Sequence, residues 1–510
     1  MSSSKPKRLI VCCDGTWFNS HHGFVKTSWY KRIGTLQVPS NVTRISRCFR
    51  RTCSDGKVQV VNYQSGVGTG SNMLDTLTGG AFGMGIAMRI KEVYSFLAAN
   101  YFDGDEIILI GFSRGAFTAR SVAGMIAKLG LLTREGIGHF YPIFMDMNRW
   151  NCGGEDQFPN VPFANKPHGP GAAEAYRARL EELGLTRVRQ GGGAGSLITV
   201  KAIACWDTVG SLGIPQIEWL NKLGGHLAQS STHQFWDTSL SDRVEHAFHA
   251  LALDETRISF TPAVWERLPE NACSTDLRQV WFPGSHGNIG GGTDDQGMAD
   301  ITLAWMMDQL ASIDVEFDDD SFNYTVARTQ ACYDSTPPKA FIPKAFAKEP
   351  IYTANNPRRP WALGAICRDT NLLWRLTGSH VRRPGMQRQA ATGCSKGARP
   401  PFLKDTSERI HSSVRVRMLC EGLDLNDEGL WTCRALRGYW QLKKRRLTFD
   451  SLEEPTEAIE GGGERYVYVY VGPLDESAER TLAEEPMGPF ERRLLEMTAG
   501  EPNVWQYASV

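Results

Sequence analysis

Residues 106–116 constrain the fold most, because they read as a buried strand, a tight turn and the start of a helix. Residues 107–110 are continuously apolar and mostly β-branched, which is typical of a parallel strand covered on both faces. Gly111, Ser113 and Gly115 then fit the pattern G-x-S-x-G, which places a serine on a strained strand-to-helix turn. Residues 116–129 continue with helical character. The stretch therefore predicts a serine hydroxyl at the carboxyl end of a strand, where helix N–H groups favour a developing negative charge.

The composition limits the partners of such a fold. The 510 residues suffice for one large α/β domain with additions, or for two to three domains. Lys+Arg and Asp+Glu both total 56, which predicts no bulk attraction to nucleic acid or to acidic membranes. The 12 cysteines are scattered without zinc-site spacing, and residues 1–8 do not resemble a secretory signal. We therefore expect a cytoplasmic protein with reduced thiols.

The apolar runs of the sequence also indicate how the protein could contact a membrane. No apolar run approaches the length that spans a bilayer, so we expect no transmembrane segment. Peripheral contact with a membrane surface and the oligomeric state stay open.

Three further strand-like segments also end in polar residues with chemical potential. Residues 8–13 lead to Asp14, residues 197–206 lead to Asp207, and residues 277–282 lead to a glycine-rich loop that carries His286. Because the carboxyl ends of parallel strands lie along one edge of a sheet, these side chains and Ser113 are expected at the same edge. The order Ser, Asp, His along the chain is that of α/β-hydrolases.

This order predicts a role for each residue of a catalytic triad. Ser113 is the expected nucleophile, His286 the expected general base and acid, and Asp207 the carboxylate that orients the imidazole. The backbone N–H of Arg114 is the expected oxyanion donor, with a second donor from the Gly15-Thr16 loop. Since these groups supply nucleophile, base and charge stabilisation, we expect neither a metal nor an organic cofactor.

Other interpretations of the N-terminal motifs are weaker. A hydrolase of the haloacid dehalogenase type also begins with an apolar strand and D-x-D-G-T, but its nucleophilic aspartate would fall at Cys12. Phosphoryl transfer from Asp14 would require magnesium, and a turn aspartate more often caps or braces a loop. Residues 66–70 lack both the G-x-G-x-x-G spacing and the Gly-Lys-Ser/Thr ending of a phosphate-binding loop.

The other histidines offer rivals to His286. His246 and His249 lie in residues 242–253, whose periodicity predicts a helix, and no third ligand accompanies them. His411 is the serious rival, since α/β-hydrolase histidines often lie late on a loop. We prefer His286 because it follows a strand, whereas His411 has no clear buried strand before it.

A long insertion, residues 136–196, separates the nucleophile helix from the strand that leads to Asp207. It is rich in Gly, Pro, Asn and aromatic residues, which is typical of a lid or a binding loop. We expect it over the carboxyl edge of the sheet, where its apolar side chains would line the approach to Ser113 and bind an acyl group: Phe140, Tyr141, Phe144 and Met145.

Four motifs together resemble a known family: CDGTW at residues 13–17, GFSRGA at 111–116, WDTVGS at 206–211 and FPGSHGNIGGG at 282–292. They resemble the α/β-hydrolase family that includes the catalytic domain of the type VI secretion phospholipase effectors, over roughly residues 8–313. The resemblance implies a Ser-Asp-His triad at Ser113, Asp207 and His286. Asn288 stands where many relatives are expected to carry aspartate, which concerns a secondary contact near the histidine loop.

These observations predict an α/β-hydrolase-like fold with a mainly parallel sheet and helices on both faces. Residues 1–335 form the expected catalytic domain, and residues 336–510 form an expected C-terminal extension packed on it. The predicted function is a serine esterase or lipase-like hydrolase that acts on a carboxylic ester, with a lipid or phospholipid as one candidate. The alternative is a catalytically silent α/β-hydrolase scaffold that acts as a binding protein. We find no counterpart of the membrane-anchoring modules of the secreted effectors, which makes ester hydrolysis the firmer expectation.

Overall fold

The computed structural model describes most of the chain, in two compact units. The described residues are 5–15, 24–26, 34–66, 79–150, 156–191, 195–209, 239–335, 358–367, 378–389, 400–446, 464–473, 481–500 and 504–508. The first unit contains residues 1–248 and 267–276, and the second contains residues 249–266 and 277–510. The predicted boundary between a catalytic domain, residues 1–335, and a C-terminal extension stays a prediction.

The first unit is built on four parallel strands. Three of them are almost wholly buried, because their side chains are apolar on both faces. In order of pairing the strands are β4 (Gln59–Gln64), β1 (Arg8–Cys13), β5 (Glu106–Phe112) and β8 (Val200–Trp206). Their parallel register places all four carboxyl ends at one edge, as the sequence predicts for β1, β5 and β8.

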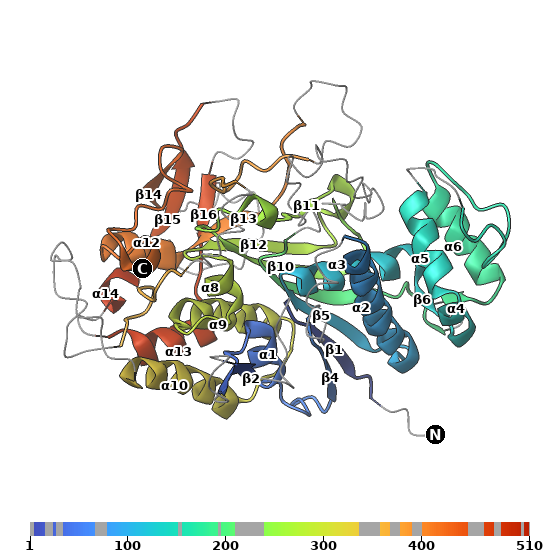
Figure 1. The fold of residues 1–510 in the computed structure, drawn as a ribbon, viewed down its shortest axis with the longest axis horizontal. Helices are drawn as coiled ribbons and strands as arrows, with labels where there is room; N and C mark the ends of the chain where they lie inside the picture. The colour runs from blue at the N-terminus through green and yellow to red at the C-terminus, as the bar shows by residue number, and fades with distance from the viewer. Residues whose placement is uncertain are drawn as a thin grey trace. The chain divides into compact units, whose positions relative to one another are not determined.

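Among the described residues of the first unit, six helices accompany these strands. The apolar face of α2 buries Ile86, Ile90, Val93 and Leu97, which recur at helical spacing. Helices α4, α5 and α6 of the insertion group beside α2 and α3 (Figure 1). The bounds are α1 (Asn41–Ser46), α2 (Gly79–Asn100), α3 (Arg114–Leu129), α4 (Arg134–Gly138), α5 (Phe140–Arg149) and α6 (Ala172–Glu182).

The second unit contains parallel strands β12, β13 and β16, followed at the edge by the antiparallel strands β15 and β14. Their bounds are β12 (Asp276–Phe282), β13 (Glu408–His411), β14 (Trp440–Arg446), β15 (Glu464–Tyr470) and β16 (Thr481–Glu485). Strand β13 pairs with β12, so residues of the predicted C-terminal extension belong to the sheet. The helices are α8 (His286–Gly290), α9 (Gly297–Ala311), α10 (Asp319–Ser335), α12 (Ser412–Leu419), α13 (Pro489–Thr498) and α14 (Trp505–Ala508).

The strand order confirms the predicted fold class. With β10 (Val244–Ala252), ten strands form one mainly parallel sheet in the order β14-β15-β16-β13-β12-β10-β8-β5-β1-β4. The part of the chain that the structure describes also contains three two-stranded pairs: β2 (Phe24–Lys26) with β3 (Gly34–Leu36), β6 (Leu131–Leu132) with β7 (Thr186–Arg187), and β9 (Ser239–Leu240) with β11 (Glu266–Arg267).

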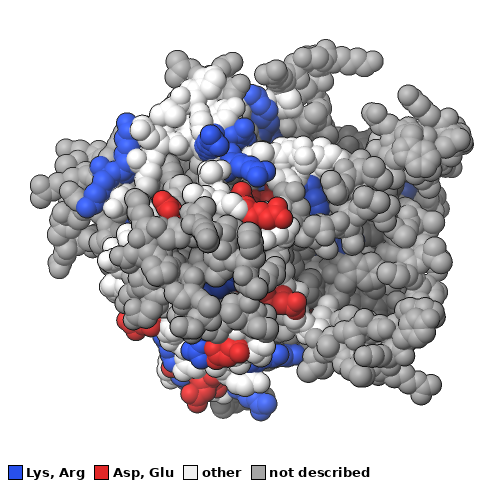
Figure 2. Space-filling view, turned by 60° about the vertical axis from the view of Figure 1, so that its left-hand side comes forward, with Lys and Arg blue, Asp and Glu red and all other residues white. Residues whose placement is uncertain are grey.

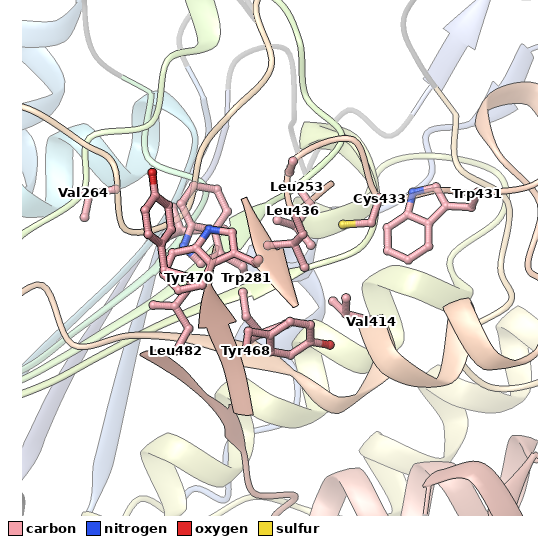
Figure 3. Packing of buried hydrophobic residues seen from close by; sticks show 14 of the residues in the cluster. Leu253, Val264, Trp281, Val414, Trp431, Cys433, Leu436, Tyr468, Tyr470 and Leu482 are labelled. Carbon is pink, nitrogen blue, oxygen red and sulfur yellow. The ribbon is translucent and has the colours of Figure 1, made fainter. Parts of the chain in front are cut away.

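The core of the second unit is rich in aromatic residues. Figure 3 shows Trp281 of β12 gathered with Tyr468 and Tyr470 of β15, together with Leu253 and Leu482. These side chains come from strands far apart in the chain, and each is less than a tenth exposed. Aromatic side chains bury large apolar areas, so this cluster joins the late strands to β12.

The predicted helix over residues 242–253 is wrong, because Val244–Ala252 form β10. Residues three apart on a strand point to opposite faces, so His246 and His249 cannot bind one metal together. His246 is instead paired with Asp276, 3.3 Å away, and His249 is hydrogen-bonded to Gln279 at 3.2 Å. Neighbouring strands overrode a pattern that also fits a helix.

Surface properties agree with the balanced composition. The face drawn in Figure 2 carries both basic and acidic side chains. None of the described helices combines the length and the hydropathy needed to cross a membrane. The described cysteines carry free thiols, as the sequence predicts.

Candidate active site

Ser113 lies at the turn between β5 and α3. Its backbone has φ 57° and ψ −121°, a combination that L residues rarely adopt and that costs about 1–3 kcal/mol. Its side chain is mostly buried, and its N–H donates a hydrogen bond to the carbonyl oxygen of Trp206 at 3.0 Å. The strained strand-to-helix turn that the G-x-S-x-G pattern predicts is therefore present.

The start of α3 packs directly against the end of β1. A Cβ atom added at Gly115 would lie well inside contact distance of the carbonyl oxygens of Cys13 and Asp14. Only glycine permits this approach, so the second glycine of the motif sets the position of the helix N-terminus.

Asp207 lies beside Ser113 on the neighbouring strand. Phe112 pairs with Trp206 in the parallel register, so Ser113 and Asp207 are the next residues of two strands about 4.8 Å apart. Asp207 is fully buried and also has a positive φ, 38°. The sheet register thus brings together two of the three predicted triad residues.

Asp14 is enclosed by hydroxyl groups. Its carboxylate accepts hydrogen bonds from Ser40 Oγ at 2.7 Å, Thr43 Oγ1 at 2.8 Å and Tyr63 OH at 2.6 Å. Burial raises the pKa of Asp14, and the hydrogen bonds from Tyr63, Ser40, Thr43 and the Gly15 N–H oppose that rise. Such an environment braces the end of β1, which favours the structural interpretation of Asp14 over phosphoryl transfer.

The predicted oxyanion donors differ in their surroundings. The Gly15 N–H donates to Asp14 Oδ1 at 2.7 Å, so in this conformation it is directed at its own neighbour's carboxylate. Thr16 lies outside the described residues. Arg114 is the first residue of α3, where backbone N–H groups point out of the helix N-terminus. Burial lowers the pKa of its guanidinium to about 10. The role of the Arg114 N–H as oxyanion donor stays a prediction.

His286 lies in the second unit, at the start of α8. It is 7% exposed, and its ring packs edge-on against Phe260 with centroids 4.8 Å apart. Gly284, two residues earlier, has φ +120°, and an added Cβ there would lie 2.7 Å from Asn288 Cβ. The glycine-rich loop therefore turns sharply before the histidine, while the predicted partnership of His286 with Ser113 and Asp207 stays a prediction.

Asn288, which replaces an expected aspartate, holds this loop. Its Oδ1 accepts the N–H groups of Ser285 and Cys367, both at 3.1 Å, and its Nδ2 donates to the carbonyl oxygen of Ala365 at 2.8 Å. An aspartate could accept the same two bonds but could not donate the third. The departure from the family pattern thus matches a contact of this chain.

Asp254 and Glu255 are site residues that the sequence reasoning missed. They come two and three residues after the end of β10, whereas Ser113, Asp207 and Asp14 follow their strands directly. The mistaken helix over residues 242–253 hid the strand before them. Asp254 Oδ2 accepts the N–H of Gly284 at 2.7 Å, and Glu255 Oε2 accepts the N–H of His286 at 3.3 Å. Both carboxylates therefore hold the histidine loop.

His411, the rival base, is the last residue of the short strand β13, so the expectation that no clear buried strand leads to it is wrong. Its ring is fully buried, with Nε2 2.5 Å from Glu491 Oε1 and Nδ1 2.7 Å from Ser413 Oγ. It also stacks on Phe282, with centroids 4.4 Å apart. Burial lowers the pKa of His411 to about 3. These contacts engage both ring nitrogens in the core of the second unit.

The insertion does not lie where the sequence predicts. Phe140 stacks with Phe144 and packs against Tyr94, whose hydroxyl donates to the carbonyl oxygen of Gly130 at 2.6 Å. Gly130 follows the last residue of α3, a 16-residue helix about 24 Å long that begins beside Ser113.

Further contacts agree with that placement. The N–H of Gly191 donates to Asp103, which precedes β5. Tyr141 is 45% exposed and packs against Phe158, and Met145 is half-buried on the same helix. The predicted position of Phe140, Tyr141, Phe144 and Met145 over Ser113 is therefore wrong.

Comparisons with known proteins identify a family and several similar chains. Residues 7–309 match the family model "T6SS, Phospholipase effector Tle1-like, catalytic domain". Over 287 residues the chain is 25% identical to the uncharacterized protein YEL023C of Saccharomyces cerevisiae. The matched region covers 52% of this chain and 34% of that protein.

Two solved structures are also similar at 16% identity. The Tle1 effector bound to the VgrG spike of a type 6 secretion system gives a TM-score of 0.28, with 56% of this chain and 51% of that chain covered. An uncharacterized protein from Pseudomonas aeruginosa gives 0.33, with 62% and 47% covered. The matches thus span about a third of the yeast relative and about half of each solved chain.

The family match extends over more than half of the chain. It includes β1, β5, β8 and β12, whose carboxyl ends lead to Asp14, Ser113, Asp207 and His286. This chain belongs to the family of T6SS phospholipase effector Tle1-like catalytic domains.

Proposed function

We propose that this chain is a serine hydrolase that cleaves carboxylic esters, with Ser113 as nucleophile, His286 as base and Asp207 as orienting carboxylate. The observation that carries the proposal is the strained turn of Ser113, with Asp207 at the equivalent position of the neighbouring strand. Membership of a phospholipase effector family supports the same class of reaction and makes a phospholipid the leading candidate substrate.

The proposed reaction has two halves. Ser113 Oγ attacks the ester carbonyl carbon while His286 takes its proton, and the N–H of Arg114 stabilises the oxyanion. The intermediate collapses, the C–O bond to the alcohol breaks, and the imidazolium protonates the leaving alcohol. A water molecule then attacks the acyl-enzyme with His286 again as base, which releases the acid and restores the serine. No step uses a metal or an organic cofactor.

A fluorophosphonate probe tests the nucleophile. We expect covalent labelling of the wild-type protein and none of Ser113→Ala. Ser121→Ala is the matched control, because Ser121 is a buried serine of the same helix whose hydroxyl donates to Phe117 O. Equal labelling of Ser113→Ala would refute the nucleophile, and no labelling of folded wild-type protein would favour a silent binding scaffold.

A substrate panel tests the reaction class. We expect turnover of acyl-nitrophenyl esters or of phospholipids, and a decrease of about 10³-fold or more in kcat for His286→Ala and Asp207→Asn. Turnover should survive chelation and Asp14→Asn. Magnesium-dependent turnover that Asp14→Asn abolishes would instead support phosphoryl transfer.

A further inference from the structure

Hydrogen bonds join the end of β10 to the glycine-rich loop that carries His286. The N–H of Leu253 donates to Phe282 O at 3.0 Å, and the N–H of Asp254 donates to Gly284 O at 2.9 Å. The two segments therefore run in the same direction, and the N–H of Gly284 donates a hydrogen bond to the Asp254 carboxylate. This pairing brings Glu255 and His286 together.

The Glu255 carboxylate is buried and rigidly held. It is 1% exposed, and Arg257 binds both of its oxygens, from Nε to Oε1 at 2.9 Å and from a terminal nitrogen to Oε2 at 2.8 Å. The Arg257 backbone N–H adds a third bond to Oε1 at 2.8 Å. A bidentate arginine fixes the plane of a carboxylate, so Oε2 meets the N–H of His286 in a defined direction.

The charges around Glu255 keep it ionised. Burial alone would raise its pKa, but the hydrogen bonds from Arg257 and the charges of Arg257, Arg382 and His286 overcome burial and lower the pKa to about 2. Arg382 is itself buried, where it donates to the carbonyl oxygens of Ala252 and Phe260. Glu255 is thus an anion paired with Arg257, and its negative charge also acts on Arg382 and His286.

The same group confines the imidazole ring. Phe260 meets the ring of His286 edge-on, and the Arg257 guanidinium lies over Phe260 at 3.6 Å from its centroid. Arg257 therefore contacts both the Glu255 carboxylate, which accepts the His286 backbone N–H, and the Phe260 ring, which packs against the His286 side chain. Loss of the carboxylate would release the arginine and leave uncompensated positive charge near the imidazole.

We propose that Glu255 is a positioning residue for His286: held by Arg257, its carboxylate anchors the histidine backbone and stabilises the imidazolium that forms during ester cleavage. The proposal deepens the proposed function and rests on it for the role of His286 as base. Asp207 keeps its role in that mechanism, and Glu255 supplies a second negative charge from a different strand.

A titration of the imidazole tests the proposal without activity. The protein is labelled with ¹³C in its 11 histidines, and the His286 signal is assigned by its loss in His286→Gln. Because a neighbouring anion favours the charged imidazole, the His286 pKa should fall in Glu255→Gln by about one pH unit or more. Glu266→Gln is the matched control, since Glu266 is also a buried carboxylate of this unit but bonds Lys404 N and Gln389. An unchanged His286 pKa in folded Glu255→Gln would overturn the proposal.

The pH dependence of kcat/KM provides the kinetic counterpart. A base must be neutral to act, so the acidic limb should move to lower pH in Glu255→Gln, with kcat reduced by about 10–100-fold and KM little changed. If Glu255→Gln and Glu266→Gln lose equal amounts of kcat and the acidic limb of kcat/KM does not move in either variant, Glu255 has a structural role. That result would contradict the proposal that Glu255 positions His286. If instead the imidazole titration shifts while His286→Gln leaves ester turnover intact, the proposed function fails and the electrostatic coupling stands.

Discussion

The backbone N–H of Ser113 donates to the carbonyl oxygen of Trp206 across 3.0 Å, which ties the turn after β5 to the last residue of β8. Because Phe112 and Trp206 are paired in register, Ser113 and Asp207 leave their strands side by side, and both have positive φ. The backbone pairing of two adjacent strands therefore sets the spacing of the candidate nucleophile and carboxylate.

Gly115→Ala should destabilise the protein, because the new Cβ would clash with the backbone of Cys13 and Asp14, which cannot yield without moving β1. We expect a loss of about 2 kcal/mol or more in the free energy of unfolding, measured by urea denaturation. Gly124→Ala is the matched control in the same helix, since no atom lies within 4 Å of its added Cβ. That variant should be about as stable as the wild type or more stable by up to about 1 kcal/mol. Equal effects at the two positions would contradict the packing of α3 on β1.

The strained backbone of Ser113 predicts that glycine is the more stable replacement there, which is the reverse of the order inside a helix. Glycine adopts φ 57°, ψ −121° more easily than alanine, so Ser113→Gly should be more stable than Ser113→Ala by about 1 kcal/mol, although both lose the nucleophile. At Ser121, inside α3, alanine should be the more stable replacement by about 1 kcal/mol. Thermal unfolding of the four variants measures both differences. The same order at both positions would argue against a strained turn.

Asn288→Asp should weaken the histidine loop, because aspartate cannot donate to Ala365 O and brings a charge into a fully buried position. We expect a loss of about 1–3 kcal/mol in the free energy of unfolding by urea denaturation. Asn100→Asp, at an exposed amide that donates to Phe96 O, should change stability by less than about 1 kcal/mol. A fully stable Asn288→Asp variant would show that the donated bond is dispensable.

His411 should make stability fall as the solution becomes acidic. Burial lowers its folded pKa to about 3, below the ordinary value of 6.5, so the unfolded chain binds a proton that the folded protein does not. The stabilisation is complete above pH 6.5 and decreases as the pH falls toward about 3. Between pH 7 and pH 5 the wild type should lose about 2 kcal/mol more than His411→Gln, measured by urea unfolding at both pH values. Parallel pH profiles would show that His411 does not carry this dependence.

Local sequence signals determined the strands and helices nearest the candidate nucleophile. The apolar runs of β1 and β5 each stop at a polar turn, and G-x-S-x-G specifies both the turn at Ser113 and the helix that follows. Such signals survive because a strand buried on both faces requires continuous apolar residues, and a sharp turn requires glycine. The parallel class of the sheet follows from the same pattern.

Only the tertiary structure decided the identity of β10, the contacts of Glu255 and the position of the insertion. Val244, Ala247, Phe248 and Leu251 satisfy the spacing of a buried helix as well as that of a buried strand, and the adjacent strands β8 and β12 select the strand. Glu255 meets His286 because β10 lies beside β12, a relationship between residues 31 apart that no local pattern records. The aromatic residues of the insertion predict that these side chains are buried, but they do not identify the surface against which they pack. The contact of Phe140 with Tyr94 shows that they pack away from Ser113.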